Sequence, residues 1–66
     1  MMRVDSKAIK KRVYEKFGWK MTFWAKRRGF TQWQVYDFFR GKAGRDTSRR
    51  LVEALRRDGV LVDRDN

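Results

Sequence analysis

The stretch AKRRGFTQWQVYDFFRGK, residues 25–42, has the residue types that two short helices need in order to cross at a tight turn. A close crossing needs a small residue at the contact, and the turn needs a residue that tolerates positive φ. Ala25 and Gly29 meet these two needs, and Val35 is the apolar residue with which the second helix faces back. The spacing therefore predicts a helix-turn-helix over about residues 21–40.

Helical phase divides the side chains of residues 31–40, because successive residues of an α-helix are rotated by about 100°. The apolar side is expected to join the core together with the residue before the helix: Phe30, Val35, Phe38 and Phe39. The outer side and the N-terminal tip carry Gln32, Trp33, Tyr36, Asp37 and Arg40. Aromatic rings at this density can also form a stacking platform for unpaired bases, but the phase favours a scaffold. The sequence leaves three roles open for Trp33: a contact with a base, packing against its own helix, or packing at a dimer seam.

Glycines divide the rest of the chain into lengths that suit helices, because glycine commonly stands just past a helix end. They are Gly18, Gly29, Gly41, Gly44 and Gly59. The expected N-caps are Asp5 or Ser6 for the first helix, Thr31 for the third, and Asp46 or Thr47 for the last. Residues 1–66 are therefore expected to form one all-α domain, a compact bundle of four or five short helices, with a frayed tail over about residues 62–66.

Side chains suited to catalysis are scarce, because the 66-residue chain contains no cysteine and no histidine. Histidine is the usual general base at neutral pH and the commonest metal ligand. We therefore expect a protein that is not an enzyme, with no catalytic residue, metal, cofactor or small-molecule substrate. No apolar run approaches the roughly 18 residues of a membrane span, so we expect no membrane partner and a cytoplasmic location.

Positive charge is the strongest feature of the composition, with 18 Lys and Arg against eight Asp and Glu and a net charge of +10. Most of the excess lies in residues 19–50, which hold nine bases and two acids. One basic face of this strength indicates a polyanionic partner, with nucleic acid favoured over an anionic membrane. Free N–H groups at the start of the last helix suit a phosphate. The residues expected to contact phosphate are Thr31, Lys42, Arg45, Thr47, Arg49 and Arg50.

Residues 24–42 resemble the helix-turn-helix of the lambda-repressor and Cro superfamily, whose usual form is A-x-x-x-G-[apolar]-[Ser/Thr]-x-x-x-[Val/Ile]-x-x-[apolar]-[apolar]-x-G-[Lys/Arg]. The chain looks most similar to the small proteins of Mu-like phages, in which a tryptophan precedes the alanine, as Trp24 does here. Arg28 departs from the usual apolar residue, which either weakens the core slightly or leaves an arginine whose stem packs while its head reaches solvent. The resemblance implies a transcriptional repressor of a phage or mobile element in a bacterial host cell, acting as a homodimer. The residues expected at the dimer seam are Val60, Leu61 and Val62, although Val60 can also fold back on the last turn after Gly59 in a Schellman arrangement.

The resemblance also places the tip of the second helix of the pair in the major groove of double-stranded DNA. Gln32 can pair with adenine there through two hydrogen bonds, and Arg40 can pair with guanine or a phosphate. Asp37 can accept from cytosine, while Trp33 and Tyr36 can contact thymine methyl groups or sugar. Two plainer roles stay open, because Asp37 can pair with Arg40 at the surface and Tyr36 can pack and bond a phosphate.

Three other functions remain open. An excisionase or architectural DNA-binding factor is also short and basic, but it usually has a β-wing after the helix-turn-helix, where this chain predicts a helix. A binder of single-stranded nucleic acid or RNA needs exposed aromatic rings, whereas helical phase places most of these rings on the buried side. A protein-interaction module is not distinguished from the others by the sequence.

Overall fold

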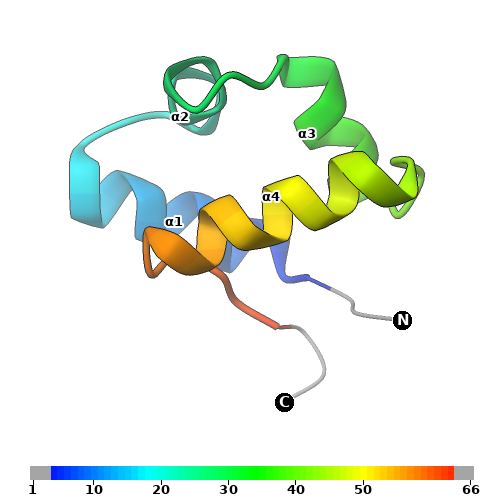
Figure 1. Ribbon diagram of the computed structural model, residues 1–66. Helices are drawn as coiled ribbons and strands as arrows, with labels where there is room; N and C mark the ends of the chain where they lie inside the picture. The colour runs from blue at the N-terminus through cyan, green and yellow to red at the C-terminus, as the bar shows by residue number, and fades with distance from the viewer. Residues whose placement is uncertain (1–3, 64–66) are drawn as a thin grey trace.

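The computed structural model describes residues 4–63, and four α-helices lie in that range. They are α1 (Ser6–Phe17), α2 (Met21–Arg27), α3 (Gln32–Phe39) and α4 (Arg45–Arg57). α1 contacts α2, α2 contacts α3, and α3 contacts α4. Figure 1 shows α4 crossing in front of α1, with α2 and α3 above them. The predicted all-α bundle is confirmed, and the β pairing within residues 4–63 is limited to an isolated bridge between Val4 and Asp63.

The core draws side chains from every helix and from both sides of the helix-turn-helix. Its buried members are Ile9, Val13, Met21, Trp24, Ala25, Phe30, Val35, Phe38, Leu51, Leu55 and Val60. Phe39 was expected among them, but it is only half-buried and packs at the edge of the core. Its ring lies beside Phe38 and beneath the ammonium group of Lys10, 5.8 Å from the ring centroid. A charged side chain from α1 therefore covers the ring where a buried residue would have an apolar neighbour.

α2 and α3 are joined by a tight turn at Gly29. The amide of Phe30 donates to the carbonyl of Ala25 at 2.8 Å, and the amide of Gly29 donates to the carbonyl of Lys26 at 3.3 Å. This pair of bonds forms a Schellman cap, which requires left-handed backbone at Gly29, where φ is +83°. The turn directs Phe30 into the core beside Trp24, with 6.2 Å between ring centroids. α2 and α3 are thus the crossing pair that the spacing predicts.

Side chains cap the first and third helices as expected. Asp5 accepts from the amide of Ala8 at 3.0 Å at the start of α1. Thr31 and Gln34 form a capping box at the start of α3, in which each side chain accepts from the other residue's amide at 3.1 Å and 2.9 Å. This box fixes the direction in which α3 leaves the turn.

The expected cap of the last helix is wrong. α4 begins at Arg45 with Gly44 as its N-cap, so Asp46 and Thr47 lie inside the first turn. The reason is that α3 ends in a second Schellman cap, with the amide of Lys42 bonded to the carbonyl of Asp37 at 2.7 Å. Little chain is left between the two helices, and Gly44 offers no side-chain acceptor for the first amides of α4.

The chain after α4 returns to the start of α1. The amide of Val60 donates to the carbonyl of Leu55 at 3.0 Å, and Val60 is fully buried, so its predicted place in a dimer seam is wrong. Leu61 and Val62 are half-buried. The carbonyl of Val62 accepts from the amide of Asp5 at 2.9 Å. Val62 and Asp63 are therefore paired with the N-terminal segment, contrary to the expected fraying, and residues 64–66 lie outside the described range.

Candidate nucleic-acid interface

The outer face of α3 carries the residues that were predicted to read bases. Gln32 and Arg40 are exposed, and so are Trp33 and Tyr36, whose exposed fractions are 67% and 43%. Trp33 leans against its own helix, where its ring meets that of Tyr36 edge-on at 6.1 Å between centroids. The structure therefore places neither ring in the core, and both present a free apolar edge to solvent.

Asp37, the fifth predicted reader, is half-buried and pairs with Arg40 at 3.3 Å between Oδ1 and Nη2. Such an exposed pair three residues apart stabilises a helix by only a few tenths of a kcal/mol. The surface ion pair with Arg40, which the sequence allowed as an alternative role for Asp37, is thus present in the structure. The pair also makes the outer face of α3 neutral in sum, although the chain around it is strongly basic.

A hollow of about 230 Å³ beside α3 brings in basic residues that were not predicted to contact DNA. It lies between α1, the start of α2 and α3, and its polar lining is formed by Lys10, Lys20, Thr22, Gln32 and Tyr36. A second hollow, between α2 and the start of α3, is lined in part by Lys26 beside Thr31 and Gln32. Residues 6–30 contain nine Lys and Arg but a single acid, Glu15, and this imbalance is the signal that could have identified these lysines.

The predicted phosphate contacts other than Thr31, whose hydroxyl accepts in the capping box at the start of α3, lie beyond the C-terminal end of α3 and along α4. Lys42, Arg45 and Arg49 are exposed, and Thr47 is half-buried. The first amides of α4 have no side-chain cap, so they remain available to an anion at the positive end of the helix dipole. Arg50 lies apart from this group, because its guanidinium stacks over the ring of Phe30, 5.4 Å from the centroid, beside the α2–α3 turn.

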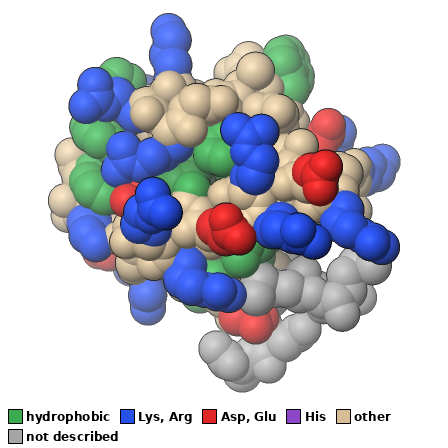
Figure 2. All heavy atoms as spheres, viewed as in Figure 1, with side chains coloured by type: hydrophobic (Ala, Val, Ile, Leu, Met, Phe, Trp, Pro, Cys, Tyr) green, Lys and Arg blue, Asp and Glu red, His purple; other side chains and the backbone are tan. Residues whose placement is uncertain are grey.

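The face of the molecule that carries α4 is of mixed charge. Figure 2 shows the face that α4 crosses, where Lys and Arg side chains are mixed with Asp and Glu. α4 and its C-cap contribute Asp46, Glu53 and Asp58. The more purely basic surface belongs to α1 and α2, next to the outer face of α3.

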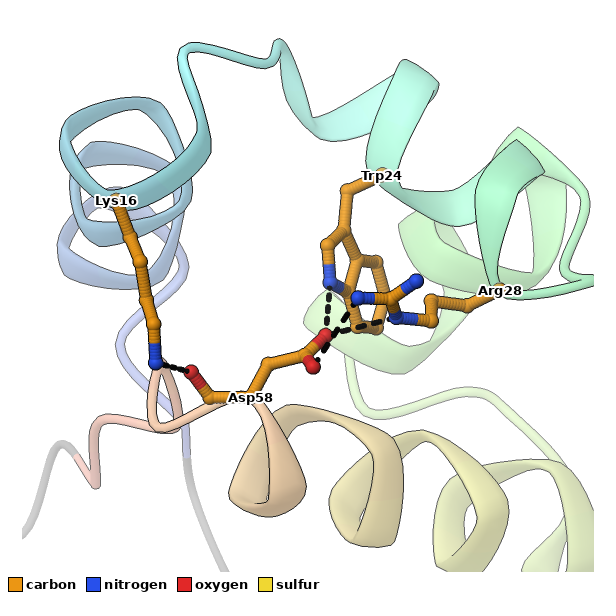
Figure 3. Close-up of polar contacts among 4 residues, drawn as sticks. All are labelled: Lys16, Trp24, Arg28 and Asp58. Atoms are coloured by element: carbon orange, nitrogen blue, oxygen red, sulfur yellow. Dashed lines mark hydrogen bonds and ion pairs between the residues drawn. The ribbon is translucent and has the colours of Figure 1, made fainter.

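Asp58, the C-cap of α4, connects this helix to α1 and α2, as Figure 3 shows. Its Oδ2 accepts from the indole N–H of the fully buried Trp24 at 2.7 Å and from Nε of Arg28 at 2.9 Å, while Oδ1 accepts from Nη2 of Arg28 at 3.1 Å. Lys16 donates to the main-chain carbonyl of Asp58. The guanidinium of Arg28, whose side chain is still 32% exposed, is therefore also paired with a carboxylate, a contact that the sequence did not predict. The reason is that a buried indole N–H and the C-cap of α4 bring an acceptor within its reach.

The same contacts shift two pKa values. Burial raises the pKa of Asp58, but the hydrogen bonds from Arg28 and Trp24 and the attraction of Arg28 and Lys16 outweigh it, so the pKa lies below its ordinary value. The hydrogen bond to Asp58 raises the pKa of Arg28, against a smaller opposing effect of burial. Both groups are therefore charged at neutral pH, and the pair holds α2 against the end of α4.

Within residues 4–63, no group of three or more acidic side chains is placed to hold a metal ion. In the same range, no helix combines the length and the apolar character that crossing a bilayer requires. Searches with the sequence and the structure matched no family model, no curated protein and no solved structure.

Proposed function

We propose that the protein binds double-stranded DNA in a sequence-specific manner, with α3 in the major groove. The observation that supports this most is the outer face of α3, which is exposed, neutral in sum and bordered by cations on two sides. Lys10 and Lys20 lie on one side, and Lys42 and Arg45 on the other. Base edges carry hydrogen-bonding and methyl groups without net charge, while phosphates line the groove, so this division of side chains suits both.

In this proposal, Gln32 at the tip of α3 pairs with an adenine and Arg40 with a guanine or a phosphate. Asp37 orients Arg40 through their ion pair in the free protein. The lysines and arginines around α3 contact phosphates, and they set the register and most of the affinity without distinguishing sequences.

The pattern of residues 24–42 supports a narrower proposal: a transcriptional repressor of a phage or mobile element, acting in the cytoplasm of a bacterial host cell. A homodimer on a palindromic operator belongs to the same proposal. The symmetry of the preferred DNA site would report on it, since a dimer related by a two-fold axis selects two inverted half-sites.

Two features count against the other functions. α4 follows α3 directly, and residues 4–63 contain an isolated bridge in place of a β-wing, which disfavours an excisionase-like factor. Phe30 and Phe38 are buried, and Phe39 is half-buried, so most of the aromatic run is not free to stack on single-stranded bases.

Selection from random duplex DNA tests the proposal, because the purified protein should enrich a defined motif. Gln32→Ala is expected to relax the preference at one base pair and to cost about 1–3 kcal/mol on the best site. Lys42→Ala is expected to weaken all sequences alike and to leave the motif unchanged. A selection that returns no motif, or one in which single strands outcompete duplexes, would contradict the proposal.

A further inference from the structure

The exposed aromatic pair on α3 has no structural role that accounts for its position. Trp33 and Tyr36 are 67% and 43% exposed, and they contact each other edge-on at 6.1 Å on the outer side of the helix. Aromatic side chains contribute to stability mainly by burying large apolar areas, and this pair leaves much of that area in water. A ligand that covers the two rings would gain the free energy of burying this apolar area.

The surroundings of the pair indicate which kind of partner covers it. Tyr36 lines the hollow that also holds Lys10, Lys20 and Gln32. A second copy docked here by the same face would bring its own Lys10 and Lys20 against these lysines, and like charges oppose such an approach. A polyanion with uncharged, partly apolar groups between its phosphates matches both the lysines and the rings, and the major groove of duplex DNA has that character.

We propose that Trp33 and Tyr36 together form an apolar contact for the 5-methyl groups of thymines in the major groove. This inference rests on the proposed function and deepens it, because it names the base feature that the pair recognises. The thymine methyl is the one apolar group on the major-groove edges of the four bases. An adenine read by Gln32 is paired with a thymine, so the same base pair places a methyl group close to the residue that follows Gln32 in the chain.

The edge-on geometry also suits this contact. Each ring restricts the other, so the pair presents a rigid apolar surface and loses little conformational freedom when it is covered. Because the 5-methyl group is absent from uracil while its hydrogen-bonding edge is the same, uracil isolates the methyl contact from every other base contact.

The test is to replace each thymine of the selected site by deoxyuridine, one position at a time, and to measure Kd by fluorescence anisotropy. Uracil at one or two positions is expected to lower the affinity of the wild-type protein about fourfold, the ratio that corresponds to the free energy of burying one methyl group. Trp33→Ala is expected to bind more weakly and to be insensitive to uracil at a position where the wild type is sensitive. Trp33→Phe should keep part of the sensitivity.

Tyr14→Ala is the matched control, because Tyr14 is a comparably exposed aromatic residue, at 64%, on α1; it should leave the uracil effect unchanged. Alanine is a strong helix former, and circular dichroism would confirm that Trp33→Ala is folded. The inference alone is overturned if a motif is selected but contains no thymine, if no uracil substitution weakens binding, or if Trp33→Ala is as sensitive to uracil as the wild type. A selection without any motif overturns the proposed function and this inference with it.

Discussion

Asp58→Ala is expected to lower the free energy of unfolding by about 2–3 kcal/mol, because it removes charge-assisted hydrogen bonds and leaves the buried indole N–H of Trp24 without its acceptor. The carboxylate is only 12% exposed, so water replaces the lost bonds poorly. A domain of this size has few kcal/mol of stability to lose. Its melting temperature should therefore fall by about 10–20 °C, measured by circular dichroism.

Glu53→Ala is the matched control, since it removes one negative charge from the exposed side of the same helix. It should change the melting temperature by no more than a few degrees, as a substitution on the surface does. Asp58→Asn keeps an acceptor for Trp24 and should be intermediate. If Asp58→Ala and Glu53→Ala were equally stable, the link between α2 and the end of α4 would have no energetic importance.

Acid should weaken the same link. The pKa of Asp58 is lower in the folded protein than in the unfolded chain, so its contribution is complete above the unfolded value of about 3.9 and is lost as the pH falls through the folded value. The wild type should therefore lose stability below about pH 4 more steeply than Asp58→Asn, which has no proton to take up at this site. If the free energies of unfolding of the wild type and Asp58→Asn, measured in urea, fell in parallel with pH, Asp58 would not be responsible for the loss of stability in acid.

Raising salt from 50 to 200 mM is expected to weaken duplex binding by about 6,000-fold per protomer, if seven cations contact phosphate at about 0.9 released counterions each. The seven cations are Lys10, Lys20, Lys26, Lys42, Arg45, Arg49 and Arg50. If only the four cations predicted from the sequence contacted phosphate, the same calculation gives a loss of affinity of about 150-fold. The slope of log Kd against log salt therefore measures whether the surface formed by α1 and α2 takes part.

Lys10→Ala tests this surface at one residue, because Lys10 lies in the hollow beside Gln32 and Tyr36. It should reduce the salt slope by about one. Lys11→Ala, the exposed neighbour on the same helix, lies outside that hollow and should leave the slope unchanged. Equal slopes for the two variants would show that Lys10 does not contact phosphate.

Local patterns were enough to predict the helix-turn-helix and the two sides of α3. Ala25, Gly29 and Val35 impose requirements within a few residues of one another, and helical phase alone separates Phe38 from Tyr36. These features depend on chain geometry over one or two turns, so they need no knowledge of how the helices pack.

Contacts between distant segments could not be predicted in the same way. The acceptor for Trp24 is Asp58, 34 residues later, and no spacing rule connects the two. Lys10 reaches the edge of α3 from α1, and it covers Phe39 where the pattern predicted a core residue. Val60 was named for a dimer seam and also as a residue that can fold back on the last turn after Gly59; the structure confirms the second, local expectation and buries the side chain.

Backbone amide chemical shifts, followed by NMR while the selected duplex is added, show whether the outer face of α3 contacts base pairs. If the outer face of α3 reads base pairs, the largest changes should fall in residues 31–42, with smaller ones at Lys10 and Lys20. A scrambled duplex of the same composition should leave the amides of Gln32 and Trp33 nearly unchanged at the same concentration. If the largest changes instead fell at the C-terminal end of α4, or if both duplexes shifted the amides of α3 equally, α3 would not be the helix that distinguishes sequences.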